Sequence, residues 1–561
     1  MITRRDFWTA SMATAALLGT GSLRHVAAQG RLSQDELLRF EARGQVTILH
    51  LTDLHAQLLP VHFREASTNI GVGEMRGLLP HLTGPEFLKT FAIPPKSALA
   101  YGLTSADYVE LARYYGRMGG LDRIVTLIKA IRAERSDRVL LLDGGDSWQG
   151  SWGALQTRGQ DMADAMALLQ PDAMTGHWEF TLGAARLKQL ADAQSFPLLA
   201  QNIHDAEFGD RVFAASRVFE RGGIRIAVIG QAFAYTPIAN PRWLVPDWTF
   251  GLREAEMQVE VDILRAGGAD VVVLLSHNGL DVDRKMVSRV RGIDVVLSGH
   301  THDALPEVTR VGKTLILASG SNGKFVSRLD LDVQGKEIRG FSYRLIPVLA
   351  DAIVPDAEMA ALVARVRAPF AADLGRVLGH SGGLLYRRDS IAGSLDDMIC
   401  DAMLAERDAE IALSPGMRWG TTILPGQAIT FEDVTNATAV TYPANYRLEM
   451  TGAQIKAILE DVADNIFNPD PYLQSGGDMV RTGGLAFAID VGKPAGGRIG
   501  DMVLLRSGQP IEASRTYAVT GWASVSEGIE GPPIWETVER HLAGHRVVEG
   551  KPGVNVRVKG M

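Results

Sequence analysis

Four apolar runs, rich in leucine and β-branched residues, lie between residues 46 and 297. Runs of this length bounded by polar residues are typical of strands that are buried on both faces of a sheet. The strands predicted in this way cover residues 46–51, 139–142, 271–275 and 294–297.

Each predicted strand ends in a short motif that contains acidic or histidine residues. Open α/β sheets bind their ligands at the carboxyl ends of strands, so these motifs mark a candidate site. In order they read Asp53-Leu54-His55, Gly144-Gly145-Asp146, Ser276-His277-Asn278 and Gly299-His300-Thr301-His302, with a fifth segment, Thr175–Thr181, between the second and third.

Strand-like and helical patterns alternate from residue 46 to residue 348, which favours an α/β layered domain, predicted here over residues 40–348. Residues 349–378 are charged, with small apolar residues, and form a predicted linker helix. Scattered Gly and Pro with short strands then indicate an α+β domain over residues 379–561. Other predicted elements are strands at 224–229 and 313–318 and helices at 105–133, 250–266, 394–407 and 451–465.

Composition narrows the possible functions. The chain has 561 residues, 46% of them hydrophobic, which is enough for two or more domains with large cores. The formal net charge of −8 provides no basic surface for nucleic acid. The one cysteine, Cys400, excludes an internal disulfide, and its apolar helical surroundings predict a buried, inert thiol.

The N-terminus has the features of an export signal. Arg4 and Arg5 precede a mildly apolar run, and Val26-Ala27-Ala28 offers a small-residue cleavage site. Paired arginines before such a run are typical of a twin-arginine signal, although a chance pair in an ordinary export signal is the alternative. We expect a signal over residues 1–28, a mature chain beginning near Gln29, and a periplasmic protein without membrane insertion, because no other run is long enough to span a bilayer.

The strand-end motifs together offer ligands for two metal ions. Asp53 and His55 lie two positions apart on one loop and can bind the same ion, while the two oxygens of Asp146 can bridge two ions. Two ions roughly 3.5–4 Å apart can hold both the attacking and the leaving atoms of a displacement. Carboxylate and imidazole ligands without thiolates suit manganese, iron or zinc. The remaining candidate ligands are His177, His277, His300 and His302.

The other histidines carry no such pattern. His62, His81 and His204 belong to no motif and are predicted to be surface or structural residues. His50 lies inside a predicted strand, where a hydrogen-bonded core histidine is expected.

The five segments, in this order, resemble the metallophosphoesterase domain of the 5′-nucleotidase family. The C-terminal region is similar to the second domain of that family at Ser414–Arg418, Gly426–Thr430 and Gly476–Val480. The resemblance implies a four-layer α-β-β-α first domain of calcineurin-like type. It also implies one metal held by Asp53, His55, Asp146 and His302, and another held by Asp146, His177, His277 and His300.

Further segments resemble one branch of that family, the thiosulfohydrolases (sulfate thiol esterases) of the bacterial sulfur-oxidation (Sox) system. This branch is implied to use two Mn²⁺ ions and to release sulfate, by attack of a metal-bound hydroxide, from a thiosulfonate on a cysteine of the SoxYZ carrier protein. The segments are Gly176–Thr181, Trp148–Gly150, Gly230–Phe233, Pro237–Arg242, Ser414–Gly420, Glu460–Asn465 and Asp470–Tyr472.

The fifth segment departs from the nucleotidase pattern. The nucleotidase family has Gly-Asn-His-Glu with an Asp two residues later, whereas His177, Trp178 and Thr181 replace that Asn, His and Asp. A nucleotidase must expel an alkoxide, whose parent alcohol has a pKa near that of water, about 15.7. A thiosulfonate expels a sulfur anion, and an ordinary thiol has a pKa of about 8.5. The leaving group therefore needs little protonation, and the His-Asp pair becomes dispensable.

Several residues are candidates for contact with a sulfonate. A guanidinium fork matches a sulfonate edge, so Arg418, together with Arg387 or Arg388, is predicted to offset the developing charge. Trp178 either excludes bulky ligands or replaces a packed side chain. Accessory candidates are Tyr386 and Asn322.

Two other functions remain open from the sequence. A periplasmic 5′-nucleotidase or related phosphoesterase would use the same ligands but leaves His177-Trp178 and Thr181 unexplained. A non-catalytic metal-binding partner is disfavoured, because a degenerate homologue would be expected to lose ligands. If the substrate is a cysteine on the flexible arm of a carrier, the metals should lie at the foot of a channel between the two domains.

Overall fold

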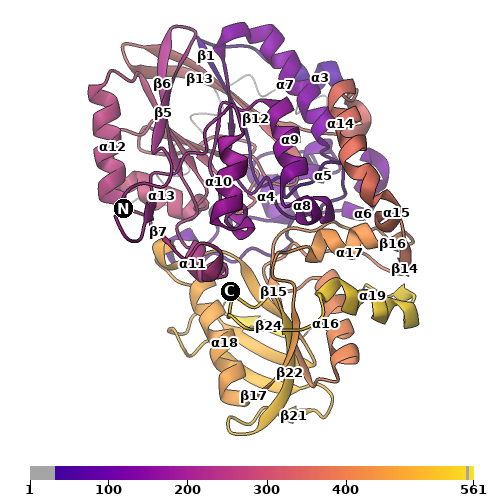
Figure 1. Ribbon diagram of the computed structural model, residues 1–561. Coiled ribbons are helices and arrows are strands. Elements are labelled where there is room, and N and C mark those ends of the chain that lie inside the picture. Colours follow the sequence, from indigo (N-terminus) through magenta and orange to yellow (C-terminus); the bar gives the residue numbers. More distant parts are fainter. Residues whose placement is uncertain (1–31, 551–554, 561) are drawn as a thin grey trace.

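The computed structural model describes residues 32–550 and 555–560. The predicted export signal lies outside the described residues. The chain is arranged in two parts, a large layered domain and a smaller domain formed by the C-terminal third (Figure 1).

The first sheet of the large domain is mixed. β1 is parallel to β2, and β2 is parallel to β3, while β12 and β13 add antiparallel strands on the other side of β1. All six residues of β1 are buried, as the apolar run predicted. The order across the sheet is β13 (Glu337–Pro347), β12 (Phe325–Gln334), β1 (Val46–Leu51), β2 (Val139–Asp143) and β3 (Ala173–Met174).

The second sheet has a parallel centre and antiparallel edges. Its central strand β8 is completely buried, which again confirms the interpretation of an apolar run as a core strand. The order is β10 (Thr309–Val311), β11 (Thr314–Ala318), β9 (Val295–Ser298), β8 (Val271–Ser276), β6 (Ile224–Gln231) and β5 (Ser216–Arg221).

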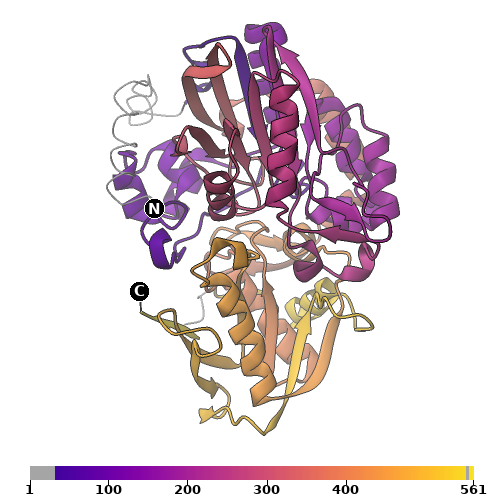
Figure 2. The same cartoon turned by 90° about the vertical axis from the view of Figure 1, so that its left-hand side faces the viewer.

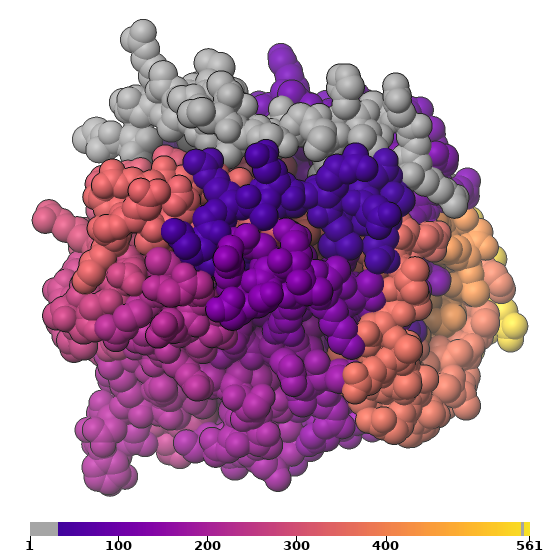
Figure 3. All heavy atoms as spheres, turned by 90° about the horizontal axis from the view of Figure 1, so that it is seen from above, coloured from indigo at the N-terminus to yellow at the C-terminus, as the bar shows by residue number. Residues whose placement is uncertain are grey.

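Helices cover the outer face of each sheet. α7 (Leu121–Arg135), α9 (Gln160–Leu169) and α14 (Ala357–Arg367) lie beside the first sheet, and α12 (Glu254–Ala266) and α13 (Leu280–Arg289) lie beside the second (Figure 1). The predicted α-β-β-α order of layers is therefore confirmed. Seen from the end opposite the C-terminal domain, the large domain forms most of the coloured surface, and part of the C-terminal domain is visible at the right edge (Figure 3).

Two predicted helices differ from the observed elements. The helical pattern at 105–133 forms α6 (Tyr108–Tyr115) and α7, because Gly116, Gly119 and Gly120 adopt positive φ angles that end the first helix. Phe250 belongs to β7 (Trp248–Phe250), and α12 begins four residues later. The predicted linker contains α14 and the short α15 (Ala371–Leu374), and α14 packs against α7 and α9.

The C-terminal domain is α+β, as predicted. Its main sheet has the order β17 (Asn445–Thr451), β22 (Thr516–Trp522), β15 (Ile411–Gly416) and β18 (Asp478–Gly483). A second sheet contains β21 (Gln509–Pro510), β20 (Ile499–Leu504), β19 (Leu485–Asp490) and β24 (Val556–Lys559), and a third contains β16 (Ala428–Thr430), β14 (Val377–Ser381) and β23 (Val547–Val548). The helices are α16 (Ser394–Arg407), α17 (Phe431–Thr438), α18 (Gly452–Ile466) and α19 (Ile534–Gly544).

Smaller elements complete the large domain. They are α3 (Gln34–Leu38), α4 (Gly84–Thr90), α5 (Ala98–Leu103), α8 (Trp152–Thr157), α10 (Ala184–Asp192), α11 (Thr236–Ala239) and β4 (Ile203–Asp205). Among the helices of residues 32–550, none is long and apolar enough to cross a membrane.

Aromatic side chains join the two domains. Trp152 of α8 packs edge-on against Phe431 and Trp535, with ring centroids 5.1 and 5.4 Å away. The segment before α4 also reaches the C-terminal domain (Figure 2), where the Thr422 N–H donates to the His62 carbonyl at 2.7 Å. These contacts hold the C-terminal domain against the strand ends of the large domain.

A buried carboxyl links the ends of β8 and β9. Both Ser276 and Ser298 donate hydroxyl hydrogen bonds of 2.6 Å to Asp283 of α13. Ser276 directly precedes His277, and Ser298 lies two residues before His300. Burial raises the pKa of Asp283 to about 7.

We predict that Asp283 makes the stability of the protein depend on pH. The pKa in the folded state exceeds the unfolded value of about 3.9, so the stabilisation is complete below pH 4 and is lost as the pH rises through 7. Between pH 5 and pH 8 the wild type should lose about 2–3 kcal/mol more unfolding free energy than Asp283→Asn. Denaturant titrations at both pH values measure this difference, and the exposed Asp137→Asn should behave as wild type. Equal pH dependence in Asp283→Asn and the wild type would contradict the assignment.

Candidate metal centre

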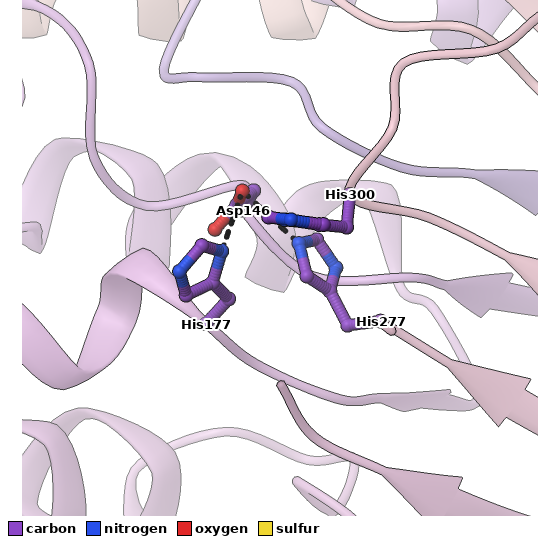
Figure 4. Close-up of side chains that lie close together, drawn as sticks. All are labelled: Asp146, His177, His277 and His300. Carbon is purple, nitrogen blue, oxygen red and sulfur yellow. Dashed lines mark hydrogen bonds and ion pairs between the residues drawn. The ribbon is translucent and has the colours of Figure 1, made fainter. Parts of the chain in front are cut away.

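The two sheets bring the predicted ligands to one place. Asp53 and His55 follow β1, Asp146 follows β2, and His277 follows β8. His177 lies just beyond β3, and His300 and His302 follow β9, so seven side chains from loops of both sheets converge. Each is at most 9% exposed. Figure 4 shows four of them, with the rings of His177 and His277 directed toward the Asp146 carboxylate.

The converging residues form two groups of four, each able to hold a metal ion. One group contains Asp53, His55, Asp146 and His302, and the other contains Asp146, His177, His277 and His300. In each group the ligand atoms lie within 4.8 Å of one another. Asp146 belongs to both groups, which is the geometry of a bridging carboxylate. These are the two ligand sets that the family resemblance implied.

Close approaches between the ring nitrogens and carboxylates define the centre. Asp146 Oδ2 lies 3.2 Å from His177 Nδ1, 3.0 Å from His277 Nε2 and 4.0 Å from His55 Nε2. On the other side, His302 Nε2 lies 3.3 Å from Asp53 Oδ1. His55 Nε2 and His302 Nε2 are only 2.9 Å apart.

The donor chemistry fits two divalent cations. Two neutral imidazoles that both direct a lone pair to one point repel each other, and a cation between them removes the repulsion. Burial, together with the nearby His302 ring, lowers the pKa of His55 to about 3, so the His55 ring is neutral and free to bind a metal. Burial also holds the pKa of His300 well below its usual range. Although burial alone would raise it, the pKa of Asp146 is held low by His177 and His277.

His277 illustrates how the protein orients a ligand. Its Nδ1 lies 2.6 Å from the Gly144 carbonyl oxygen and donates a hydrogen bond to it. Nδ1 therefore carries a proton, and Nε2 faces the centre. Although burial alone would lower it, the carboxylates of Asp146 and Asp53 raise the pKa of His277 to about 10, so a metal ion at the centre would take the place of the Nε2 proton. A backbone partner of this kind is the usual means of fixing the tautomer of a metal-binding histidine.

Glu179 holds two metal-binding loops together, a role that the sequence reasoning missed. Its buried carboxylate accepts backbone N–H bonds from Ser147 at 2.7 Å, His177 at 2.9 Å, Trp148 at 3.2 Å and Asp146 at 3.3 Å. Burial and the charge of Asp146 raise the pKa of Glu179. The sequence did contain one signal for this role: Glu179 is an acidic residue two positions after the predicted ligand His177, close to a buried strand.

The altered segment contributes an aromatic wall. Trp178 lines the cavity above the centre and packs edge-on against Trp419, with centroids 4.6 Å apart. Its backbone N–H donates to Asp146 Oδ1 at 2.7 Å. The Thr181 hydroxyl donates to the Trp178 carbonyl at 2.7 Å and so closes the turn. Trp178 thus faces the cavity, while Thr181 stabilises the loop behind it.

Two further residues shape the centre and were missed from the sequence. The Phe233 ring lies 4.0 Å from that of His177 and 4.2 Å from that of His300. A Cβ atom at Gly476 would lie 2.1 Å from His300 Nε2, so this position of the C-terminal domain excludes a side chain. Both contacts depend on chain segments that are distant in sequence, which motif reading cannot detect.

A cavity of about 620 Å³ opens above the metal centre between the two domains. Metal-binding residues, Trp178 and Trp419 line its inner part, and residues of both domains line the outer part. Ile238 and Leu473 at the mouth are 69% and 62% exposed. We call this the front cavity.

Among the three candidate arginines, Arg418 alone is found in the front cavity lining. Its guanidinium donates to the Gly477 carbonyl at 2.9 Å and to Asp478 at 3.2 Å. Arg387 is fully engaged elsewhere, 2.9 Å from Asp396, and also donates to two backbone carbonyls. Arg388 donates to the Thr301 carbonyl at 3.2 Å, behind the cavity. The predicted substrate contacts by Arg387 or Arg388 are therefore not supported.

The two accessory candidates also lie away from the described lining of the front cavity. The Tyr386 ring lies under the guanidinium of Arg64, 4.1 Å from it. Asn322 is buried, and its backbone N–H donates to the Asp53 carbonyl at 2.8 Å. Asn322 thus supports a ligand loop, and Tyr386 packs at the domain boundary.

His50, His62, His81 and His204 lie outside both ligand groups. His50 is completely buried on β1, with Nδ1 2.7 Å from the Ser319 hydroxyl. His81 pairs with Asp281 at 2.9 Å and His204 pairs with Glu256 at 3.0 Å. Cys400 is buried, as predicted.

Comparison with known proteins places this geometry among related enzymes. Residues 46–304 match the calcineurin-like phosphoesterase family, and residues 377–538 match the 5′-nucleotidase C-terminal domain. The chain is 24% identical to the mouse 5′-nucleotidase over 479 residues, 76% of this chain and 81% of the relative.

Two solved structures show the same architecture. The sulfate thiohydrolase SoxB of Thermus thermophilus, in complex with glycerol, superimposes with a TM-score of 0.90 and 37% identity, covering 93% of this chain and 98% of that one. A 5′-nucleotidase precursor from the same species has a TM-score of 0.74 and 22% identity, covering 92% and 100%. The latter likeness concerns the fold alone.

We predict that His177→Ala lowers the metal content of the protein by about half. The second group then keeps only three of its four ligands, while the first group keeps all of its own. Elemental analysis of protein loaded with Mn²⁺ and then desalted measures the content. His204→Ala is the matched control, since His204 lies outside both groups. Full metal content in His177→Ala would remove this residue from the ligand set.

Glu179→Gln should destabilise the protein and weaken metal binding together. Replacing one carboxylate oxygen with an NH₂ group leaves two buried N–H donors without an acceptor, at a cost of about 2–4 kcal/mol. Denaturant unfolding and metal titration measure the two effects. The exposed Glu86→Gln provides the control. Retention of both wild-type values in Glu179→Gln would show that the carboxylate does not organise the loops.

Proposed function

Because the chain belongs to the SoxB family of metal-dependent hydrolases, within the 5′-nucleotidase group of metallophosphoesterases, we propose that it releases sulfate from a thiosulfonate carried on a protein cysteine. The carrier is the SoxYZ protein, the two metal ions are Mn²⁺, and the enzyme acts in the periplasm after twin-arginine export. The reaction is R–S–S–SO₃⁻ + H₂O → R–S–S⁻ + SO₄²⁻ + 2 H⁺. The water oxygen bonds to the sulfonate sulfur, and the sulfur–sulfur bond breaks with its electron pair on the carrier.

The single observation that carries this proposal is the altered loop after β3. In the nucleotidase pattern a histidine stabilised by an aspartate interacts with the phosphate undergoing attack, and here Trp178 and Thr181 occupy their positions. The structure keeps His177 in the metal centre while Trp178 faces the front cavity and Thr181 only closes the turn. Loss of the acid pair with retention of the metal ligands suits a sulfur leaving group.

The walls of the front cavity support a sulfonate substrate. Divalent ions at the centre supply Lewis acidity and lower the pKa of water. Arg418 reaches the cavity from the C-terminal domain and brings a positive charge opposite the centre. Asp478 pairs with Arg418 and also with Arg388 and Arg481. Three guanidinium groups share its one negative charge, so Asp478 orients Arg418 without neutralising it. Trp178 and Trp419 give its inner part an aromatic wall.

The mouth of the cavity supports a protein carrier. Ile238, Leu473 and Val525 are exposed apolar residues on three separate segments around the opening. Exposed apolar residues that gather around a binding site are a feature of protein interfaces. A cysteine at the end of a flexible arm could then reach the metal centre while its domain stays outside.

We predict that the mature protein loaded with Mn²⁺ releases sulfate from thiosulfonate-charged SoxYZ. Ion chromatography measures sulfate, and a parallel assay measures phosphate released from 5′-AMP. Removal of the metal with a chelator should abolish sulfate release, and readdition of Mn²⁺ should restore it.

The second substrate tests the alternative function, which the similarity to the mouse 5′-nucleotidase favours. Phosphate release from 5′-AMP without sulfate release from the carrier would overturn the proposal in favour of a nucleotidase. Turnover of neither substrate by metal-loaded protein would favour a binding role.

A further inference from the structure

A second cavity of about 40 Å³ adjoins the metal centre at His302. We call it the rear cavity. His302 lines both cavities and so forms part of the partition between them. The inner end of the rear cavity is formed by Glu65, Asp303 and Arg388, and half-buried Asn69 and Thr83 lie at its outer end.

The two ring nitrogens of His302 face different surroundings. Its Nε2 faces the metal centre, 2.9 Å from His55 Nε2 and 3.3 Å from Asp53 Oδ1. Its Nδ1 therefore points away from the centre, and this buried atom has no hydrogen-bond partner within the described residues. Metal-binding histidines almost always donate their second N–H to a carboxylate, a carbonyl or a water. His277 donates to the Gly144 carbonyl in this way, whereas His302 Nδ1 has no acceptor among the described residues and adjoins the rear cavity.

Two charged side chains in the same lining are also incompletely paired. Asp303 Oδ2 and Arg388 Nε are buried, and neither has a partner among residues 32–550 and 555–560. A buried polar atom that stays unpaired costs about 1–3 kcal/mol, so three such atoms around one cavity imply a polar occupant. A water needs roughly 10–15 Å³ and two to four polar partners, and the rear cavity satisfies both requirements.

The charges that surround these groups are fixed by other contacts. Arg388 donates to the Thr301 carbonyl at 3.2 Å and lies 3.7 Å from Asp478. Glu65 accepts a hydrogen bond of 2.5 Å from the buried Lys324. Neither side chain can therefore swing into the cavity without breaking a buried ion pair, so the space stays open for a small molecule.

We propose that the rear cavity is a water site and a water path, which leads from the surface near Asn69 and Thr83 to the His302 side of the metal centre. Its water would accept hydrogen bonds from His302 Nδ1–H and Arg388 Nε–H and would donate one to Asp303. The role of the path in turnover rests on the proposed function: hydrolysis consumes one water per cycle, and a carrier arm in the front cavity closes that approach. Water then reaches the centre from behind.

The first test places the water directly. A high-resolution crystal structure of the metal-loaded protein should show ordered density within hydrogen-bond distance of His302 Nδ1, Asp303 and Arg388. A rear cavity that is filled by a side chain, or that lacks density while other buried waters are ordered, would overturn the proposal.

The second test measures the path without relying on catalysis. Mn²⁺ at the centre increases the relaxation rate of water protons that exchange with it. Leu473→Cys at the front mouth, labelled with a bulky maleimide, closes the front cavity, and the buried Cys400 does not compete for the label. We expect the labelled protein to keep most of its relaxation enhancement. Ala66→Leu, which fills the rear cavity, should remove most of it only when combined with the label.

Matched variants separate the path from general disturbance. Ala191→Val adds bulk outside both cavities and should leave the enhancement of the labelled protein unchanged. Thr83→Leu blocks the outer end at an independent position, and should repeat the effect of Ala66→Leu even if that variant fails to fold. Every variant is compared at equal metal content. Loss of the enhancement on labelling of the front mouth alone would overturn the path.

A turnover assay tests whether the water path serves the reaction. With charged SoxYZ as substrate, Ala66→Leu should slow sulfate release, while hydrolysis of a small cysteine thiosulfonate, which leaves the front mouth open, should stay near the wild-type rate. Equal slowing with both substrates would overturn the role in turnover. If the wild type hydrolyses neither substrate, the proposed function fails, but the relaxation and crystallographic results still decide the water path.

Discussion

The Asp146 carboxylate is the group on which the rest of the centre depends. Its burial is costly unless positive charge or hydrogen bonds surround it. One oxygen meets His177 and His277, and the other accepts the N–H of Trp178, so the same group belongs to both ligand sets and holds the loop after β3. The two sheets must therefore align so that loops from β2, β3 and β8 meet at one carboxylate.

This requirement explains the density of buried polar groups beneath the centre. Glu179 gathers four backbone N–H groups of the loops after β2 and β3, and Asp283 ties the ends of β8 and β9 through two serines. Burial raises the pKa of both carboxyl groups, so the fold gives up stability to keep them in place. Such an arrangement positions ligands rigidly, which a centre of two metals needs.

The sequence predicted those parts of the structure that depend on local patterns. The apolar runs that became β1 and β8, and the polar motifs after them, can be read directly from the sequence, because a short continuous apolar run indicates a strand buried on both faces. Glu179, Phe233 and Gly476 could not be predicted in this way, because their roles arise from contacts between distant segments. Arg387 was predicted to contact a sulfonate because it is an arginine, but in the structure its guanidinium binds the carboxylate of Asp396 instead. That contact also joins segments whose pairing the sequence does not reveal.

The loop after β3 connects the fold to the chemistry. Replacing a histidine by Trp178 places a large ring between the metal centre and the C-terminal domain, where Trp419 and Tyr442 pack against it. The same substitution that removes an acid group thus gives the inner part of the front cavity an aromatic wall. A substrate arm packed against this wall would occupy the inner part of the cavity and limit the water that can follow it inward. A separate approach for water, behind His302, is consistent with both consequences of this one change in the loop.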